Sequence, residues 1–528
     1  MLRILYGTAG TGKSAAIMDE IRRGADSGER YILLVPEQYS HEAERELCAV
    51  CGDGLSLYAE VLSFTGLARE ISSECGGAAN EYLDKGGRLL CMALAADGLY
   101  SRLRVYGAAR RKAELQTMLL GAVDEFKSAC VTSERLLDAA ETCEGALGDK
   151  LHDLGLILEA YDGVVANGRA DPSDRLSVLA QQVGQCSMNE RTHVFVDGFT
   201  DFTAQERRVL EALLLKGVRL TVCLGCDELH GGSEVFALSR ITASALLKFA
   251  VDNGIKAQTE RRDGESTKAK PLGEFCENMF SYRAVEAGDA QGRIKIISAA
   301  DTNAECEFAA AEAVSLVRDT GCRWRDIAVC AKGFDDYRLP LESAFSRFGA
   351  PIYTARKADM LSKPLPMLIE SAYEIVLGGW EADDVFDYLR TGFGGLDTDE
   401  CDELENYVFM WQLHGSAWTR AENWRLHPEG YGKQPDEASE QTLEQINLLR
   451  ETARRPLMRF AENAAAATTA TEQAQALASL FEDLHLADKL QARAEALEKD
   501  GRAAAAQEYA QLWDITVGAL EQLSLIHI

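Results

Sequence analysis

The sequence predicts an α/β protein with two α/β units, each followed by a long helical block. Short apolar segments rich in branched residues alternate with helical segments at the N-terminus, and similar segments return after the first helical block. A glycine-rich loop that ends in Lys-Ser follows the first apolar segment, as in phosphate-binding α/β domains. These two observations set the fold class and indicate where a site would lie.

Length and composition limit the protein classes to consider. The 528 residues suffice for roughly three domains. A formal net charge of −29 excludes a uniformly basic nucleic-acid coat, although a local cationic channel can function in an acidic protein. The fourteen cysteines are irregularly spaced, which is typical of free thiols in a reducing compartment. No apolar run approaches the roughly 18 residues that a membrane helix needs, and no signal-peptide layout is present. We expect a cytoplasmic protein without membrane contact.

The first α/β unit begins at the N-terminus. Strands are predicted for LRILYG and YILLVPE, with a helix between them, and this order is typical of a parallel βαβ unit. Strand patterns return in THVFVDG and VRLTVCLG, again with a helix between them. We therefore assign the first α/β domain to residues 1–65 plus 190–285, interrupted by a helical insertion at 66–189.

A second α/β unit is expected to begin near residue 290. Strands are predicted for RIKIISAAD and DIAVCAK, which flank the helical segment NAECEFAAAEAVSLVRDTG. The chain then becomes helical again. We assign residues 290–376 to the start of the second α/β domain and 377–528 to a second helical insertion. The ending LEQLSLIHI lies inside a helical pattern without a cap, so we expect this insertion to be truncated.

The loop YGTAGTGKS fits a phosphate-binding pattern, with Gly7, Gly12, Lys13 and Ser14 at the fixed positions and Gly10 as an additional glycine. Glycines let backbone N–H groups turn toward phosphates, the lysine supplies charge to the terminal phosphate oxygens, and the serine hydroxyl is placed to ligate Mg²⁺. The positive end of the following helix adds to this attraction. The residues predicted to bind a nucleoside triphosphate are Gly7, Thr8, Ala9, Gly10, Thr11, Gly12, Lys13 and Ser14.

An acidic residue at the end of another apolar strand completes such a site, and Asp197 occupies this position. It is placed to hold Mg²⁺ through water, with a plain turn residue as the alternative interpretation. Hydrolysing motors place a glutamate next, because the attacking water needs a general base. The next residue here is Gly198, which can do no acid–base chemistry. We identify no catalytic residue and expect nucleotide binding with little turnover.

Several segments together resemble the AddB family, the B subunits of bacterial AddAB ATP-dependent helicase–deoxyribonucleases. They are YGTAGTGKS, YILLVPEQYSHEAERE, VLSFTGLARE, VFVDGFTDFTAQE and LENYV, and the resemblance covers essentially the whole chain. It implies a superfamily-1 helicase-like core of two RecA-like domains, each with a large helical insertion. It also implies ATP and Mg²⁺ as cofactors and an AddA-type helicase–nuclease subunit as the heterodimer partner. The implied ligands are double-stranded DNA ends and single-stranded DNA, in the repair of double-strand breaks by recombination.

The resemblance further implies two DNA-contacting segments. One is VPEQ, which contains Gln38, and the other is SFTGLA, which contains Ser63 and Phe64. Stacking of Phe64 on a base would contribute roughly 1–3 kcal/mol. The alternative for Phe64 is packing in the hydrophobic core. The alternative for Gln38 is an ordinary polar position on the surface or a hydrogen bond within its loop. Thr65 stands where such helicases usually carry a histidine.

The sequence departs from active superfamily-1 helicases around the nucleotide site. Five residues before the loop leave no room for an adenine-recognition segment, Gly198 replaces the glutamate, and LGCDEL lacks the glutamine that senses the γ-phosphate. A degenerate motor is therefore our prediction. An active helicase, or a different P-loop ATPase or kinase, is the alternative.

The family's nuclease domain and its iron–sulfur cluster are expected beyond residue 528, so we predict no iron–sulfur ligands in this chain. Two C-x-x-C pairs, Cys48/Cys51 and Cys223/Cys226, have a spacing found in zinc sites. Residues three apart on a strand point to opposite faces, which favours free thiols for the second pair. Basic clusters at 110–112 and 261–262 are expected to be solvated, with nucleic-acid contact as the alternative.

Overall fold

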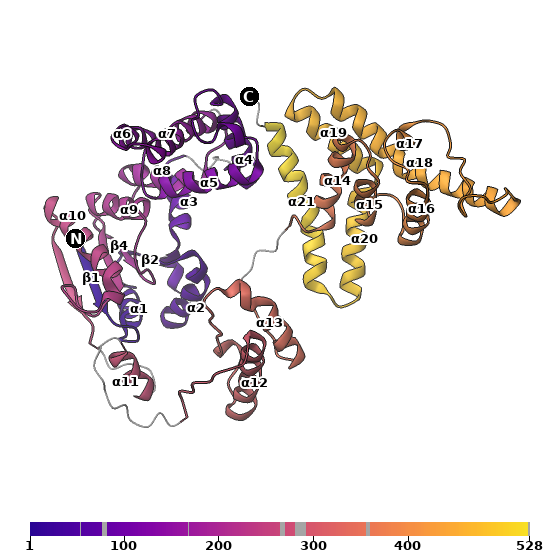
Figure 1. Cartoon of the computed structure of the whole chain (residues 1–528). Helices are drawn as coiled ribbons and strands as arrows, with labels where there is room; N and C mark the ends of the chain where they lie inside the picture. The colour runs from indigo at the N-terminus through magenta and orange to yellow at the C-terminus, as the bar shows by residue number, and fades with distance from the viewer. Residues whose placement is uncertain are drawn as a thin grey trace. The chain divides into compact units, whose positions relative to one another are not determined.

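The computed structural model describes residues 1–52, 54–76, 82–166, 168–263, 270–279, 292–354 and 360–525 (Figure 1). The chain divides into two compact units, of which one comprises Met1–Thr267 with Ser362–Ile528 and the other Lys268–Leu361. Among the described residues, no helix is both long and apolar enough to cross a membrane.

Six strands form one sheet in the order β3-β2-β4-β5-β1-β6, and every pairing is parallel. Their bounds are β1 (Leu2–Gly7), β2 (Arg30–Leu34), β3 (Ala59–Leu62), β4 (Thr192–Val196), β5 (Arg219–Gly225) and β6 (Ala257–Arg261). The α/β class is confirmed. So is the expectation that the segments around residues 2–7 and 192–198 share one parallel sheet, where β5 lies between them.

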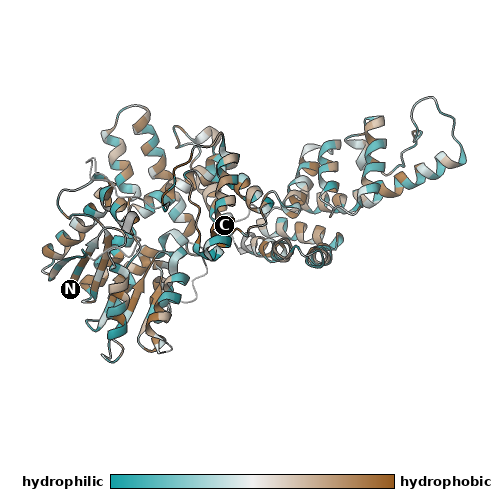
Figure 2. Cartoon of the chain, turned by 90° about the horizontal axis from the view of Figure 1, so that it is seen from below, coloured by the Kyte–Doolittle hydropathy of each residue, from teal (hydrophilic) through white to brown (hydrophobic). Residues whose placement is uncertain are grey.

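Helices cover both faces of the sheet, which explains why its central strands are apolar throughout. One face packs against α1 (Lys13–Arg23) and α2 (Ser40–Cys51). The other packs against α3 (Phe64–Glu74), α8 (Arg175–Gln182), α9 (Ala204–Leu215) and α10 (Ala237–Asp252). Figure 2 shows largely apolar strands between helices that carry both apolar and polar segments.

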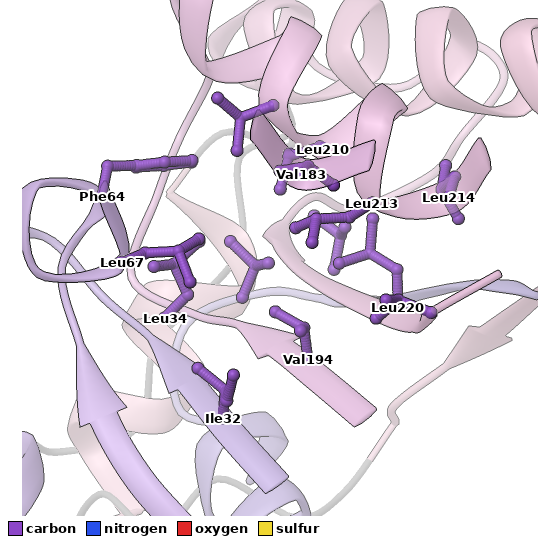
Figure 3. Packing of buried hydrophobic residues seen from close by; sticks show 14 of the residues in the cluster. Ile32, Leu34, Phe64, Leu67, Val183, Val194, Leu210, Leu213, Leu214 and Leu220 are labelled. Carbon is purple, nitrogen blue, oxygen red and sulfur yellow. The ribbon is translucent and has the colours of Figure 1, made fainter. Parts of the chain in front are cut away.

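Successive residues of each strand point to opposite faces of the sheet, and every second residue contributes to the core on the α9 face. Ile32, Leu34 and Val194 point to this face and meet Leu210 and Leu213 of α9 (Figure 3). The residues between them along the strands, such as Leu33 and Phe195, belong to the α1 face. This alternation, expected for strands covered on both sides, fixes which side chains can reach α1.

The connections of β1 and β5 run in opposite directions across the sheet. After β1 the chain passes through α1 to β2, on one side, whereas after β5 it passes through α10 to β6, on the other side of β1. A topological switch point therefore lies between β1 and β5, and ligands of open parallel sheets bind at the carboxyl ends of such strands. The phosphate-binding loop follows β1 at this edge.

Residues 66–189 are mostly helical, as expected, apart from short connections. The helices of this insertion are α4 (Lys85–Gly98), α5 (Ala113–Ser128), α6 (Ser133–Thr142) and α7 (Ala146–Val165), with α3 and α8 at its two ends. They enclose a hydrophobic core of their own, to which Met92, Leu119 and Ile157 contribute.

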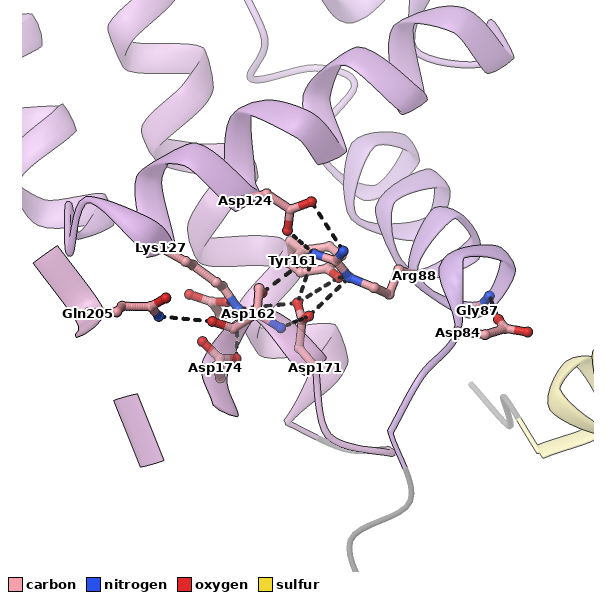
Figure 4. Close-up of polar contacts among 11 residues, drawn as sticks. Asp84, Gly87, Arg88, Asp124, Lys127, Tyr161, Asp162, Asp171, Asp174 and Gln205 are labelled. Atoms are coloured by element: carbon pink, nitrogen blue, oxygen red, sulfur yellow. Dashed lines mark hydrogen bonds and ion pairs between the residues drawn. The ribbon is translucent and has the colours of Figure 1, made fainter. Parts of the chain in front are cut away.

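A buried polar network links these helices (Figure 4). Asp171 is 1% exposed and accepts hydrogen bonds from Tyr161 Oη at 2.9 Å and from the Ser173 N–H at 2.9 Å. The Arg88 guanidinium and the Lys127 ammonium lie 3.0 Å and 3.3 Å from its carboxylate oxygens. Although burial opposes the shift, the Ser173 N–H and the two cations lower the pKa of Asp171. Asp171 is therefore the carboxylate that compensates two buried cations.

Carboxylates at the rim and one amide complete the network. Lys127 also pairs with Asp162 and Asp174, at 2.9 Å and 2.7 Å. Gln205 of α9 donates to the carbonyl oxygen of Ser173 at 2.9 Å and to Ser177 Oγ at 2.9 Å. The insertion is thus tied to a helix that packs on the sheet.

The second unit contains helices, but not the strands that the sequence predicts for 293–301 and 326–332. Its helices are α11 (Lys270–Asn278), α12 (Thr302–Thr320) and α13 (Phe334–Arg347). The helix expected between the two strands is confirmed as α12, which begins at the Asp301 cap and ends at the left-handed Gly321. A strand needs a neighbour for its backbone hydrogen bonds, and no strand occurs in residues 292–354. The predicted boundaries at 285 and 290 lie outside the described residues.

Residues 362–525 are helical, and the division into domains remains a prediction. The helices are α14 (Pro364–Gly378), α15 (Ala382–Arg390), α16 (Thr398–Trp411), α17 (Ser416–Thr419), α18 (Glu437–Ala466), α19 (Ala470–Asp483), α20 (Leu486–Lys499) and α21 (Ala503–Leu525). Arg450 of α18 anchors the preceding connection, because its guanidinium donates to the carbonyl oxygens of Trp418 and Glu422, each at 3.0 Å.

His193 lies buried in β4, away from the carboxyl edge of the sheet. Its ring stacks on Phe195 with centroids 3.9 Å apart, and its Nε2 lies 2.9 Å from Thr221 Oγ1. Burial, together with the positive charges of Arg219 and Arg3, lowers the pKa of His193 to about 3. The folded protein therefore holds this ring neutral where an unfolded chain would protonate it.

The Asp171 network predicts a stability difference between two carboxylates. Asp171→Ala removes the buried carboxylate that Arg88 and Lys127 share. We therefore expect it to lower the free energy of unfolding by about 3 kcal/mol. Asp124, which pairs with Arg88 but is 46% exposed, provides the control, and Asp124→Ala should cost less than about 1 kcal/mol. Urea unfolding of both variants measures the difference, and equal losses would contradict the assigned role of Asp171.

His193 predicts a pH dependence of stability. Its folded pKa lies below the unfolded value of about 6.5, so the unfolded state binds more protons and stability falls as the pH drops from about 6.5 toward 3. Between about pH 7.5 and pH 5, the wild type should lose roughly 1–2 kcal/mol more than His193→Gln. Urea midpoints at both pH values test this, with His41→Gln as an exposed control. Parallel pH profiles for wild type and His193→Gln would contradict it.

Candidate nucleotide-binding site

The loop between β1 and α1 has a phosphate-cradling backbone. Gly10 and Gly12 have φ angles of 86° and 77°, a left-handed region that glycine adopts without strain. A Cβ on Gly7 would lie 2.6 Å from the carbonyl oxygen of Arg262 and 2.7 Å from Thr11 Oγ1, so no larger residue fits there. The backbone thus requires glycines where the sequence has them.

Lys13 lies over the loop, and no carboxylate of the described residues forms an ion pair with it. Its ammonium donates to the carbonyl oxygens of Gly7 and Thr8, at 2.8 Å and 2.7 Å. Thr11 Oγ1 also donates to the carbonyl oxygen of Thr8, at 3.0 Å, and closes the loop. Burial lowers the pKa of Lys13, and the nearby Asp197 carboxylate opposes that shift. Phosphate oxygens would give this cation charged partners in place of neutral carbonyls, so the donor set fits a nucleoside triphosphate.

Ser14 and Asp197 are the two residues that the sequence predicts to hold Mg²⁺. Ser14 is exposed in the first turn of α1. Asp197 follows β4, is 8% exposed and accepts a hydrogen bond from the Gly198 N–H at 2.9 Å. Hard carboxylate and hydroxyl oxygens are the donors that Mg²⁺ prefers, which makes the pair suitable for it.

No general base occupies the position after Asp197. Gly198 has a φ of 83°, and a Cβ there would lie 3.1 Å from Cδ of Pro36. Of the nearby carboxylates, Glu206 accepts hydrogen bonds from the N–H and the hydroxyl of Thr203 and caps α9. Glu206 is therefore engaged at the start of α9, and residue 198 itself has no side chain that could replace the missing glutamate.

Asp227, in the LGCDEL segment, organises its own loop. Its carboxylate accepts from the N–H groups of Glu228 and Ser233, each at 2.7 Å, and pairs with Arg240 at 3.3 Å. A Cβ on Gly232 would collide with this carboxylate. These contacts give Asp227 a structural role in this conformation.

The candidate DNA contacts differ in accessibility. Gln38 is exposed in the short helix η1 (Glu37–Tyr39), which follows β2. Ser63 is buried and caps α3, since its Oγ accepts from the Gly66 N–H at 3.1 Å. Phe64 is 6% exposed and packs edge-on against Phe199, with centroids 5.6 Å apart. The core-packing alternative describes Phe64 in this structure, and base stacking would require the ring to leave that contact.

The C-x-x-C pairs contain free thiols. Cys48 is exposed and Cys51 half-buried, whereas Cys223 and Cys226 are buried, and none forms a disulfide. The Cys226 thiol donates to the carbonyl oxygen of Glu228 at 2.9 Å. Within the described residues, no three histidine, cysteine or acidic side chains converge on a common metal position.

Two contributors to the site were not foreseen from the sequence. The chain after β6 passes Gly7, with the Arg262 N–H donating to the carbonyl oxygen of Tyr6 at 2.8 Å. Cys223 of β5 directly follows Val222, which the strand register pairs with Val196, the residue before Asp197. The only sequence signal for Arg262 was its basic cluster, and the second C-x-x-C spacing was the only signal for Cys223.

Residues 4–273 match a family model described as ADDB, N-terminal. A protein of Acetivibrio thermocellus, named as the B subunit of an ATP-dependent helicase/deoxyribonuclease, is 30% identical across 97% of this chain and 46% of its own length. A protein of Desulforudis audaxviator with the same name is 33% identical across 99% of this chain and 47% of its own. The chain thus spans about half the length of the curated relatives it matches.

Gly198 predicts a cost for any side chain at its position. Left-handed backbone costs a residue with a Cβ about 1–2 kcal/mol, and the contact with Pro36 adds to this, so Gly198→Ala should lower the free energy of unfolding by about 2 kcal/mol. Gly225→Ala is the matched control, because Gly225 ends the neighbouring strand without a positive φ or a close contact. Denaturant unfolding measures both. A neutral Gly198→Ala would show that the backbone tolerates a side chain there.

Proposed function

Because the chain belongs to the ADDB family, we propose that it is the helicase-like part of the B subunit of an ATP-dependent helicase–deoxyribonuclease and that it binds ATP with Mg²⁺. One observation carries the nucleotide proposal: the glycine-backed loop with the Lys13 ammonium follows β1 at the switch point, and the Asp197 carboxylate follows β4 at the same edge of the sheet. A phosphate chain and a divalent cation need these charges on one edge.

Each residue of the loop has a separate part in holding the nucleotide. N–H groups of the left-handed Gly10 and Gly12 region and of the first turn of α1 would donate to phosphate oxygens. Lys13 would exchange its two carbonyl partners for phosphate oxygens. Ser14 and Asp197 would hold Mg²⁺, which neutralises phosphate charge when bound. No cofactor beyond ATP and Mg²⁺ is proposed for this part of the protein.

We propose that turnover is slow or absent. A fast hydrolase needs a base for water, a γ-phosphate sensor and charge stabilisation together. Gly198 supplies no base, and Asp227 is engaged in its own loop. The chain would therefore bind the nucleotide without hydrolysing it at an appreciable rate.

We further propose that the first sheet with its insertion corresponds to one RecA-like domain and that the second unit begins another. In the complete protein, paired with an AddA-type subunit, this body would guide a DNA strand during the processing of double-strand breaks. The exposed Gln38 supports a DNA-facing segment after β2. A catalytically active helicase is the second candidate, and the intact phosphate loop is the observation that favours it.

Lys13→Ala should abolish nucleotide binding, because it removes the cation that the loop holds toward the phosphates. Equilibrium titration with a fluorescent ATP analogue and Mg²⁺ measures this on the 528-residue chain. Lys216→Ala is the matched control, since Lys216 also donates to a backbone carbonyl, that of Gly184, but lies in α9's C-terminal cap. Unchanged affinity in Lys13→Ala would show that the loop is not the site.

Phosphate release separates the two candidate functions. We expect the unmodified chain to release little phosphate from ATP with or without single-stranded DNA, and we expect Gly198→Glu to leave this unchanged, because restoring one group does not restore the others. Rapid DNA-stimulated release that Lys13→Ala abolishes would establish the active helicase instead.

A further inference from the structure

The connection between α4 and α5 in the helical insertion carries an exposed aromatic ring with a cation behind it (Figure 1). The ring is that of Tyr100, and the Arg110 guanidinium lies over it, 3.9 Å from the centroid. Tyr100 is nevertheless 55% exposed. Because a guanidinium covers only one face of a ring, this exposure leaves the opposite face available to a second flat group.

Arg110 is fixed in its place behind the ring. Its Nε lies 2.9 Å from Oδ1 of Asp97, and its Nη1 donates to the carbonyl oxygen of Gly107 at 3.2 Å. The side-chain amide of Gln116 donates to the carbonyl oxygen of Arg110 at 3.0 Å. The guanidinium therefore holds its position under Tyr100 without any ligand.

A buried carboxylate holds the backbone of the same connection. Asp153 of α7 is 0% exposed. It accepts hydrogen bonds from the N–H groups of Arg104, Val105 and Tyr106, at 2.9 Å, 2.7 Å and 3.2 Å. A connection fixed in this way has little conformational freedom left to lose when a ligand binds, and such preorganisation favours affinity.

Positive charge exceeds negative charge around Tyr100. Arg110 and Arg111 share the carboxylate of Asp97, whose Oδ1 lies 2.9 Å and 3.1 Å from their Nε atoms. Two guanidiniums on one carboxylate leave one positive charge uncompensated, and the Arg111 side chain is 75% exposed. The exposed Lys112 follows, and residues 98–113 include no aspartate or glutamate. In a chain of net charge −29, this segment locally attracts anions.

We propose that this connection binds single-stranded DNA, with an unpaired base stacked on the open face of Tyr100 and the adjoining phosphates paired with Arg111 and Lys112. The inference deepens the proposed function and rests on it, because it names a place where the chain would hold the strand. That place is on the helical insertion, not on the segment after β2 that contains Gln38. Sites for single strands combine aromatic rings that stack on bases with cations that follow the backbone, and this connection has both.

The ring distinguishes a single strand from other polyanions. An acidic protein surface would pair with the guanidiniums, as Asp97 does, but its carboxylates have no large flat face to cover the Tyr100 ring. Duplex DNA keeps its bases stacked on one another, so it would also leave the ring uncovered. Stacking therefore favours a single strand, and the other two polyanions become outcomes of the test.

Fluorescence anisotropy of a labelled oligothymidylate of about 20 nucleotides tests the proposal on the 528-residue chain. Tyr100→Ala should weaken binding by about 5-fold or more, because the stacked base loses its ring. Tyr100→Phe keeps the ring and should bind like the wild type. Tyr431→Ala is the matched control, since Tyr431 is 94% exposed but has Trp411 as its ring neighbour instead of a cation.

The salt dependence of the same binding tests the two cations. Each neutralised phosphate of a single strand contributes about 0.7 to the slope of log affinity against log salt concentration. Joint replacement by Arg111→Gln and Lys112→Gln should therefore reduce that slope by about 1.4. Arg318→Gln is the control, because the Arg318 side chain is 70% exposed and pairs with Asp319 in the other compact unit.

The outcomes separate stacking from plain charge. Wild-type affinity in Tyr100→Ala overturns the proposal, as does an unchanged salt slope in the joint Arg111 and Lys112 variant. An equal loss in Tyr100→Ala for polyglutamate or for a duplex of the same charge also overturns it, because neither offers an unpaired base. Should Tyr100→Ala fail to fold, Tyr100→Leu keeps an apolar side chain without the aromatic face, and the same results decide.

Failure of the proposed function would give a different result. If the wild type binds the oligothymidylate and Tyr100→Ala binds it equally, the strand is held elsewhere and only this site is overturned. If the wild type does not bind it at all, the proposed guidance of a DNA strand by this chain fails together with the site.

Discussion

Parallel pairing of β1 between β5 and β6 is the constraint on which the rest of the structure depends. Because parallel strands are joined by helices that cover both faces, the central strands have to be apolar over their length. Polar chemistry is then confined to the ends of the strands. The carboxyl ends of β1, β4 and β5 present, in order, the phosphate-binding loop, Asp197 and the Asp227 loop. The site is thus a consequence of strand order rather than of proximity in the sequence.

The residues at this edge of the sheet are suited to binding a nucleotide but include few of the groups that its hydrolysis would need. Lys13 is held by carbonyl oxygens, which are weaker partners for a cation than phosphate. The Lys13 ammonium could therefore exchange these carbonyl oxygens for the phosphate oxygens of a bound nucleotide. In contrast, two carboxylates that follow β4 and β5 are engaged, Glu206 at a helix cap and Asp227 inside its loop. The loop has groups that would hold a bound nucleotide, whereas Glu206 and Asp227 already have other partners.

The sequence allowed the phosphate loop, the strands β1, β2, β4 and β5 and the helical blocks to be predicted, because glycine spacing and hydrophobic periodicity are local signals. Other features depended on partners far away in the sequence. β3 and β6 are short and partly polar, so only their pairing with β2 and β1 reveals them. The burial of Phe64 depends on Phe199, and the strands expected in the second unit lack neighbours among the described residues. A local pattern states what a segment prefers, whereas a strand or a buried ring also needs its neighbour.

The backbone at Gly198 disfavours a side chain at the position where a general base would be needed. The Asp197 N–H donates to the carbonyl oxygen of Leu34 at 3.0 Å, and Pro36 lies against the position where a Gly198 side chain would begin. The ends of β2 and β4 therefore lie close together at residue 198, where a glycine adopts a left-handed backbone without strain. A glutamate there would adopt a strained backbone, and its Cβ would press against Cδ of Pro36 at 3.1 Å. The absence of a base is thus a property of how two strand ends pack, which a single substitution does not reverse.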